Sequence, residues 1–345
     1  MIYRKPRIDE EDVYDKLVQH PLQSRAWGNF RETTGVTVHR LIGFEGNRMA
    51  KQIQVTFHPI PKLPYMVGYY PKGVWPDEVT LAALKELGKR ERAIMVKLEP
   101  DISTPPYQTT DLETLKTFLL GHDCQVGRPL FTPYTFIIDL TQTEDQLAAQ
   151  MKTKTRYNIK IAMKHEVQIL EDNSNEGFNE YLGLLSLTTK RQQFFAHTQH
   201  YQRNMWKYMR SAGIAHLLKA VYQGKTLVVW IVFQFNDRLF YPYGASSREH
   251  REVMASNMMM WEAIRFGKRV GCKSFDLWGA LGPDPDPKDP WFGFHKFKEG
   301  YGGVHARFVG TYDLVIDPVR YKLFRIGDRW RWKLLRLKSK LPLIN

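Results

Sequence analysis

The first 140 residues carry a pattern of apolar and polar positions that predicts helices and antiparallel strands. Two strands, at 36–44 and 49–60, are joined by Glu45-Gly-Asn-Arg48, a sequence that favours a tight hairpin turn. Further along, the pattern predicts a third strand, a helix and a buried strand, at 66–70, 78–92 and 93–98. This half of the chain therefore reads as a hairpin followed by an αβ unit.

The rest of the chain repeats that order of elements without repeating the sequence. The predicted elements are a basic helix, two further helices, three antiparallel strands, a long helix and a short buried strand, at 143–163, 176–189, 200–211, 214–222, 226–235, 238–246, 255–270 and 274–279. A loop is expected to end in Phe297-Lys-Glu-Gly-Tyr-Gly-Gly303. We therefore predict two mixed α/β domains, at 1–140 and 141–318. A C-terminal helix within 319–345 should either complete the first domain or lie on a membrane.

The composition says more about the protein's partners and cellular compartment than about its fold. The 345 residues carry a net charge of +14, which favours nucleic acid, phosphorylated substrates or an anionic membrane surface. The two cysteines lie far apart and form no CxxC motif, which predicts neither zinc nor a disulfide framework and fits a reducing cytosol. No signal peptide and no apolar run of about 20 residues is visible. We expect a cytoplasmic protein that is at most attached to a membrane, with a monomer as the default.

The candidate chemistry gathers between Arg238 and Gly303. Tyr243, Asp276 and Lys298 fall at the ends of predicted elements, where α/β proteins keep functional side chains. The chain contains no Gly-x-Ser-x-Gly, Walker A or His-Glu-x-x-His motif, and its histidines lack metal-ligand spacing. The pattern therefore indicates no covalent nucleophile, no metal and no bound cofactor.

Several motifs, in order along nearly the whole chain, resemble those of one family. They are Pro21-Leu-Gln-Ser-Arg-Ala-Trp-Gly-Asn-Phe30, Gly68-Tyr-Tyr-Pro-Lys-Gly73, Lys97-Leu-Glu-Pro100, Thr153-Lys-Thr-Arg-Tyr-Asn-Ile-Lys160, Tyr243-Gly-Ala-Ser246, Phe275-Asp-Leu-Trp-Gly279, Phe297-Lys-Glu-Gly-Tyr-Gly-Gly303 and Gly310-Thr-Tyr-Asp-Leu-Val315. The chain resembles the FemABX group of peptidoglycan-bridge peptidyltransferases.

The resemblance implies two domains of the GNAT acyltransferase fold, here without the coiled-coil insertion of some members. It implies an aminoacyl-tRNA donor carrying glycine, alanine or serine. The acceptor would be the stem-peptide amine of a peptidoglycan precursor, either lipid II or UDP-MurNAc-pentapeptide. The amino acid and the form of the acceptor are left open by the sequence.

The resemblance also assigns roles to individual residues. Lys298 matches the lysine that stabilises the oxyanion of the tetrahedral intermediate, and Lys296 is its rival. Tyr243 matches a tyrosine that lines the channel for the peptide. The alternative is that Tyr243 is an aromatic residue of the hydrophobic core. Arg31 and Arg191 are the candidates for binding the diphosphate, which suits the planar guanidinium. The family commonly has lysine at the position of Arg31, and the alternative for Arg31 is the exposed face of an amphipathic helix.

Two acidic residues complete the predicted set. Glu99 stands where the family often has aspartate before proline, so it is expected to bind the substrate amine or to orient a tyrosine. Asp276 lies among apolar neighbours and must be partnered if buried, which favours a structural role over catalysis.

Two basic segments each allow two interpretations. The charges of Lys152–Lys164 suit phosphate contacts with the tRNA acceptor stem, or are an ordinary solvated helix face. In the C-terminal helix, Trp330, Leu334, Leu337 and Leu341 form one stripe among basic residues, so 329–341 suits a peripheral membrane contact or packing on the first domain.

Two other functions compete with the transferase. An enzyme that uses acyl-CoA normally needs a glycine-rich pyrophosphate loop, and Arg307-Phe-Val-Gly-Thr-Tyr312 is a poor match to it. A non-catalytic RNA- or membrane-surface-binding protein on the same fold is the third reading. The retained Lys298, Tyr243 and Arg191 count against that third reading.

Overall fold

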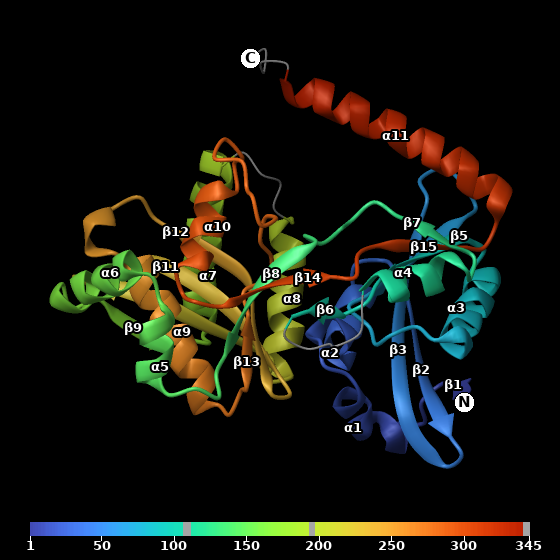
Figure 1. The fold of residues 1–345 in the computed structure, drawn as a ribbon, viewed down its shortest axis with the longest axis horizontal. Helices are drawn as coiled ribbons and strands as arrows, with labels where there is room; N and C mark the ends of the chain where they lie inside the picture. The colour runs from blue at the N-terminus through green and yellow to red at the C-terminus, as the bar shows by residue number, and fades with distance from the viewer. Residues whose placement is uncertain (106–111, 193–196, 341–345) are drawn as a thin grey trace.

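The computed structural model describes residues 1–105, 112–192 and 197–340, whose strands form two mixed sheets side by side (Figure 1). At some helix positions, among them 190–192 and 331–340, only the backbone is described. The fold is therefore of the mixed α/β class predicted from the sequence.

The first sheet has the strand order β1-β2-β3-β4-β5-β15-β7. Its strands are β1 (Ile2–Arg4), β2 (Thr37–Glu45), β3 (Arg48–Pro59), β4 (Met66–Pro71), β5 (Ala93–Glu99), β15 (Tyr312–Val315) and β7 (Cys124–Val126). Glu45 pairs with Arg48, so the predicted hairpin closes through two residues, and Gly46 supplies the positive φ of +59° that such a turn requires.

The second sheet has the strand order β6-β14-β8-β13-β12-β11-β10-β9. Its strands are β6 (Ser103–Thr104), β14 (Val304–Phe308), β8 (Tyr134–Asp139), β13 (Ser274–Asp276), β12 (Arg238–Ser246), β11 (Lys225–Phe235), β10 (Ala215–Tyr222) and β9 (Gln168–Glu171). In each sheet an antiparallel hairpin leads into one parallel pair, β4 with β5 and β12 with β13. The repeat of architecture read from the sequence is thus visible in the strand pairing.

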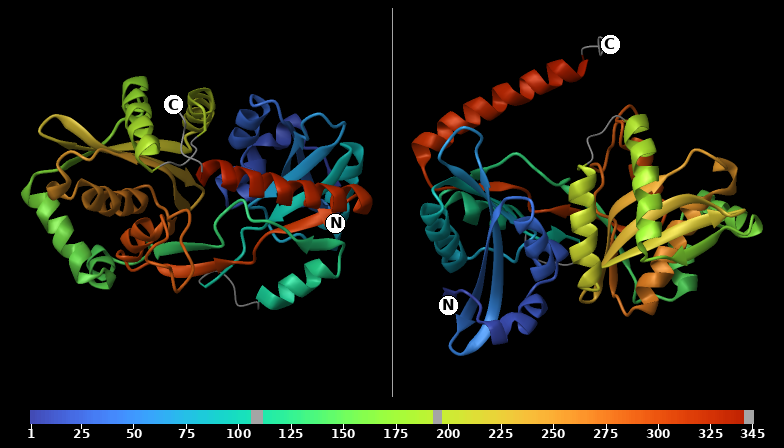
Figure 2. Two further views of the ribbon diagram at one scale, coloured as in Figure 1. Left: turned by 90° about the horizontal axis from the view of Figure 1, so that it is seen from above. Right: turned by 180° about the vertical axis from the view of Figure 1, so that it is seen from behind.

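The helices pack on both faces of the sheets (Figure 2). They are α1 (Glu11–Tyr14), α2 (Arg25–Glu32), α3 (Glu78–Arg90), α4 (Leu112–Leu120), α5 (Glu144–Gln150), α6 (Thr153–Lys164), α7 (Asn175–Gln192), α8 (Gln199–Ser211), α9 (Ala255–Arg269), α10 (Phe292–Glu299) and α11 (Pro318–Lys340), with short 3-10 turns η1 (Ile8–Glu10), η2 (Asp15–Leu17), η3 (Pro21–Gln23) and η4 (Arg251–Val253). None of these helices is both long and apolar enough to span a membrane.

The second sheet has a separate core on each face. Helices α5, α6 and α9 cover one face, where Leu147, Ile159 and Met259 share a buried cluster. The other face carries α7 and α8, and α2 joins them there, because Phe30 belongs to the same buried cluster as Trp206. The N-terminal helix α2 therefore connects the two halves of the molecule.

The two sheets do not divide the chain at a single residue. Strand β8 precedes residue 140 and pairs in the second sheet, whereas β15 comes late in the chain and pairs in the first. The division into 1–140 and 141–318 therefore stays a prediction about domains, while the sheets themselves exchange strands.

Three predicted elements differ in the structure. The basic helix is two helices, because Met151 and Lys152 are extended with ψ of 147° and 145°. Met151 is buried there, and the amide of Lys152 donates to the carbonyl of Gly300 at 2.9 Å. The loop expected around 297–299 is the end of helix α10, and the strand expected to reach residue 279 ends at Asp276.

Candidate active site

A β-bulge in β12 places neighbouring tyrosines on opposite faces of the second sheet. Phe240 pairs with Phe233 and Tyr243 with Ile231, so two residues of β12 stand opposite one of β11. Tyr241 consequently belongs to the core under α9, whereas Tyr243 packs into the core under α7 and α8. The predicted site residues fall into two groups, one on each side of this strand.

Lys298 lies in the interior of the protein on the Tyr241 side. Its side chain is fully buried, and its Nζ donates to the carbonyl of Leu277 and, at 2.8 Å, to that of Gly279. The Nζ also stands 3.9 Å from the centre of the Phe294 ring and 5.6 Å from that of Tyr241. Burial lowers the pKa of Lys298 to about 7, against the opposing charge of Asp276. The side chain of Lys298 is therefore enclosed by the protein and does not face the solvent.

The turn that holds Lys298 is built by Asp276. Its Oδ1 accepts hydrogen bonds from the Thr135 hydroxyl at 2.6 Å and from the Trp278 amide at 2.7 Å. Trp278 has a φ of +59°, which is rare for a bulky side chain, and it directs the two carbonyls toward one point. The geometry agrees with the structural role expected of Asp276, since its oxygen is used by the turn.

The rival lysine is in a different environment. Lys296 has 44% of its side chain exposed and donates to Glu299 at 3.0 Å. Lys298, two residues later, points into the interior because the two positions lie on different sides of α10. The structure therefore separates the two candidates by burial.

An ion pair joins the loop after β5 to the start of β12. The Nη1 of Arg238 donates to the Oδ2 of Asp101 at 2.6 Å, and the Nη2 lies 4.0 Å from Asp276. Burial alone would raise the pKa of Asp101, but Arg238 and the nearby Lys72 outweigh it and lower the pKa to about 2. These charges tie the two sheets together next to the turn that holds Lys298.

Glu99 is buried at the end of β5 and is saturated by donors from the protein. Its Oε2 accepts from the Tyr69 hydroxyl at 2.5 Å. Its Oε1 accepts from the Thr311 hydroxyl at 2.6 Å and from the amides of Leu130 and Phe131 at 2.7 and 3.3 Å. Since a carboxylate offers about four acceptor sites, these contacts favour the tyrosine-orienting reading over direct contact with a substrate amine.

Arg31 is half-buried on α2, where α2 meets α8. Its guanidinium lies 5.8 Å from the centre of the Tyr201 ring, and its Nε is buried without a hydrogen-bond partner in the described part of the chain. Burial raises the pKa of both Tyr69 and Tyr243, and the charge of Arg31 is close enough to oppose this for each. Tyr69 therefore lies near the charge of Arg31 and is hydrogen-bonded to Glu99, and Tyr243 also lies near the charge of Arg31.

Arg191 is the one predicted site residue that cannot be placed. Its backbone belongs to the last turn of α7, but its side chain lies outside the described residues. Sequence reasoning missed Tyr69 and Tyr201, which line the group around Arg31. Tyr69 lies inside the motif Gly68-Tyr-Tyr-Pro-Lys-Gly73, which was a usable signal, whereas Tyr201 has no motif around it.

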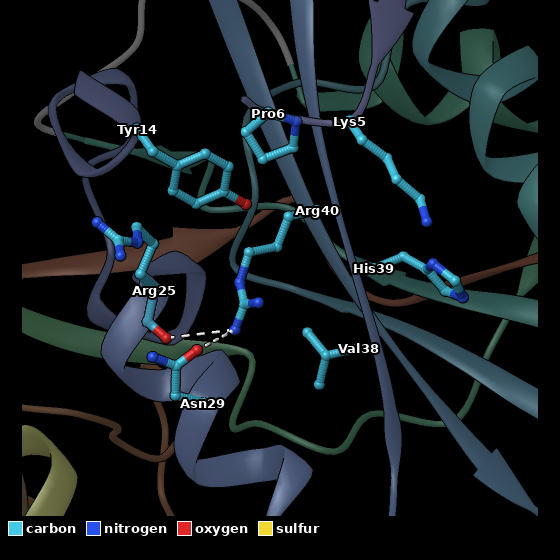
Figure 3. Close-up of a pocket in the computed structure, with 8 residues that line it drawn as sticks. All are labelled: Lys5, Pro6, Tyr14, Arg25, Asn29, Val38, His39 and Arg40. Atoms are coloured by element: carbon cyan, nitrogen blue, oxygen red, sulfur yellow. Dashed lines mark hydrogen bonds between the residues drawn. The ribbon is translucent and has the colours of Figure 1, made fainter. Parts of the chain in front are cut away.

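A separate pocket of about 360 Å³ lies on another face of α2 (Figure 3). It is lined by Lys5, Pro6, Tyr14, Arg25, Asn29, Val38, His39 and Arg40. The Arg40 guanidinium reaches across it to the Asn29 side chain at 2.7 Å and the Arg25 carbonyl at 3.4 Å. None of the predicted site residues lines this pocket, so its size alone does not make it the site.

The comparisons with known proteins agree over nearly the whole chain. The model of the FemAB family matches residues 12–218 and 218–329. A lipid II:glycine glycyltransferase from Staphylococcus epidermidis is 21% identical, over 95% of this chain and 96% of the relative. The protein of the same name from Staphylococcus aureus (strain USA300) is also 21% identical, over 96% of each chain.

The solved structures support the same fold. A crystal structure of FemX has a TM-score of 0.82 at 19% identity and covers 94% of this chain and 99% of that chain. The structure of L-PGS from Bacillus licheniformis is a weaker match, with a TM-score of 0.55 at 11% identity. The likeness to FemX and the two mixed sheets confirm the predicted mixed α/β fold. With a family model matched across both halves, the chain belongs to the FemAB family.

Proposed function

We propose that this protein is a tRNA-dependent aminoacyltransferase that adds glycine to the stem-peptide amine of lipid II at the inner face of the plasma membrane. The observation that carries the proposal is the whole-chain relation to proteins named lipid II:glycine glycyltransferase, which covers at least 95% of this chain and 96% of each relative. The predicted enzyme class, a peptide-bond-forming aminoacyltransferase, is confirmed by that relation and by membership of the FemAB family. Alanine and serine are the other amino acids to test.

The group around Arg31 is proposed to hold the precursor. A guanidinium with a buried, unpartnered Nε suits the oxygens of a diphosphate, because each N–H that meets an anionic oxygen forms a charge-assisted hydrogen bond. Tyr69, Tyr201 and Tyr243 surround it with aromatic surface, and Glu99 fixes the Tyr69 hydroxyl. Arg191 would add a second cation from the end of α7. Tyr243 is proposed to line the path of the stem peptide from this group toward β12.

The chemistry requires a neutral acceptor amine, alignment of the two substrates and stabilisation of an oxyanion. The amine nitrogen attacks the ester carbonyl of the aminoacyl-tRNA, forming the C–N bond and placing negative charge on the carbonyl oxygen. The intermediate collapses by breaking the C–O bond to the terminal ribose. A proton from the attacking nitrogen ends on the leaving ribose oxygen, which leaves an amide and a free hydroxyl.

Lys298 is proposed to stabilise that oxyanion. Two of its ammonium protons are directed to the carbonyls of Leu277 and Gly279, and the third is not used by a hydrogen bond to another oxygen in the described part of the chain. A buried charge of this kind acts through a low dielectric and needs little reorganisation during the reaction. The bulge in β12 places Tyr241, which lies beside Lys298, and Tyr243 on opposite faces of the sheet.

The proposed contact with the tRNA lies on α6. Lys154, Lys160 and Lys164 are exposed there, whereas Lys152 is paired with Glu299. Exposed lysines along one helix suit sequence-independent contacts with phosphates, which weaken as salt rises.

The test is transfer in a purified system. The protein would be incubated with lipid II or UDP-MurNAc-pentapeptide and with tRNA charged with glycine, alanine or serine, and the products read by mass spectrometry. A mass increase of one glycyl residue on lipid II is expected. Transfer from an acyl-CoA with none from charged tRNA would contradict the proposal, and so would the absence of any transfer.

A further inference from the structure

Helix α11 is fixed to the protein along one face of its first turns. Tyr321 is buried against the first sheet, and its hydroxyl donates to the Oδ2 of Asp313 at 3.0 Å. Asp328, near the middle of the helix, pairs with Arg128 at 3.2 Å. Figure 1 and Figure 2 show the helix continuing beyond this contact. The orientation of its outer face is therefore set by the fold.

The outer face of α11 carries large apolar side chains in the solvent. Val319, Leu323, Ile326 and Trp330 are 70%, 66%, 55% and 62% exposed. Their spacing of four, three and four residues places them within an arc of about 60° at ~100° per residue, roughly opposite Tyr321. Exposed apolar residues are usually scattered, so a continuous stripe on a helix whose inner face is already packed indicates a surface that meets another apolar phase.

Basic residues flank this stripe on both sides. Residues 318–340 contain nine lysines and arginines and one acidic residue, Asp328, which is turned to the protein. Arg320 and Lys322 stand on either side of the line from Val319 to Leu323. An apolar stripe bordered by cations fits the boundary between the headgroups and the acyl chains of an anionic leaflet.

Two other occupants fit this surface less well. A second copy of α11 would bring basic flanks against basic flanks, which costs energy in either orientation because the one acidic residue of 318–340, Asp328, is turned to the protein and paired with Arg128. A nucleic acid would satisfy the charges but offers no apolar phase to cover Leu323 and Ile326.

We infer that the exposed face of α11, from Val319 to Trp330, is a docking surface for an anionic lipid bilayer, with the helix lying in the plane of the membrane. The surface begins ten residues earlier than the segment 329–341 singled out in the sequence. It extends the proposed function, because an enzyme fixed in this way would meet a lipid-linked acceptor in two dimensions. The docking itself requires no substrate.

The test is co-sedimentation of the full chain with vesicles of phosphatidylcholine, with and without phosphatidylglycerol. The wild type should bind only the vesicles that contain phosphatidylglycerol, and the double variant Leu323→Ser/Ile326→Ser should bind at least tenfold more weakly. Both side chains are more than half exposed, so this variant should fold normally. The matched control is Leu120→Ser/Leu187→Ser, which removes two exposed leucines from other helices, 44% and 58% exposed, and should bind as the wild type does.

The outcomes separate this inference from the proposed function. Equal binding by the Leu323→Ser/Ile326→Ser variant, or binding to phosphatidylcholine alone, would overturn the docking surface whatever the result of the transfer assay. A wild-type dimer in size-exclusion chromatography that this variant dissociates would assign the stripe to a second copy instead. If vesicles are bound as expected but no aminoacyl transfer occurs, the docking surface stands and the enzyme proposal fails.

Discussion

Replacing Lys298 by methionine removes one buried charge while keeping an unbranched side chain of similar length. In the folded protein the ammonium is held by the carbonyls of Leu277 and Gly279 and covered by Phe294 and Tyr241. If this charge stabilises the oxyanion, its loss should lower kcat by about 100- to 1000-fold, the usual effect of removing one such donor. Precursor affinity should change little, because Arg31 and its neighbours belong to the other face of β12.

The stability of the variant can be worked out separately. A fall in the pKa of Lys298 from 10.5 to about 7 corresponds to about 5 kcal/mol, at about 1.4 kcal/mol per pKa unit. The penalty is fully present below pH 7, where both states hold the proton. It disappears between pH 7 and 10.5, because there the unfolded chain binds more protons than the folded one.

The methionine variant escapes that penalty but leaves two carbonyls without a donor, at about 1–3 kcal/mol each. The two effects are similar in size, so the free energy of unfolding near pH 7 should change little. A large loss of activity could then not be explained by unfolding.

The assay is transfer to lipid II over a range of pH, with thermal melting of the same samples. Because burial lowers the pKa of Lys298 to about 7, the kcat of the wild type should fall as the pH rises above 7. This fall should be absent from the pH profile of the variant. The matched control is Lys296→Met, which removes an exposed lysine two residues away and should leave both kcat and the pH profile unchanged. Turnover by Lys298→Met within threefold of the wild type would refute the role of Lys298. If activity is lost and the melting temperature falls as well, Lys298 stabilises the fold and does not take part in the reaction.

Three further predictions address the rest of the molecule. Arg31→Ala should raise the KM for the precursor tenfold or more with a smaller effect on kcat, since it removes a charged contact to the diphosphate; an unchanged KM in steady-state kinetics would contradict that contact. Replacing Lys154, Lys160 and Lys164 by alanine should raise the KM for aminoacyl-tRNA and flatten its dependence on salt, and an unaltered salt slope would place the tRNA elsewhere. Asp101, whose pKa is lowered to about 2, should contribute about 2 kcal/mol of stability that is present above pH 4 and lost as the pH falls to 2. Urea unfolding of Asp101→Asn should lack this loss.

Much of the local structure could be predicted from neighbouring residues alone. The hairpin around Gly46 and the long helix at 255–269 were predicted correctly, because a turn residue or a repeated apolar spacing can be recognised within a short stretch of sequence. The family was recognisable from motifs in order, and Lys298 was identified within one of them. The break between α5 and α6 was missed, because it depends on Met151 entering the core and on a contact with Gly300.

The sequence by itself determined the class of fold, the family motifs and the types of residue available for the chemistry. Only the tertiary structure decided that Lys298 is enclosed, that Glu99 is occupied by donors from the protein, and that the stripe on α11 faces the solvent between Val319 and Trp330. The physical reason is the distance along the chain between the partners. Glu99 and Thr311 are 212 residues apart, so no pattern of neighbouring residues could show that their side chains share a hydrogen bond. Burial, charge state and the direction of a side chain arise from such distant contacts.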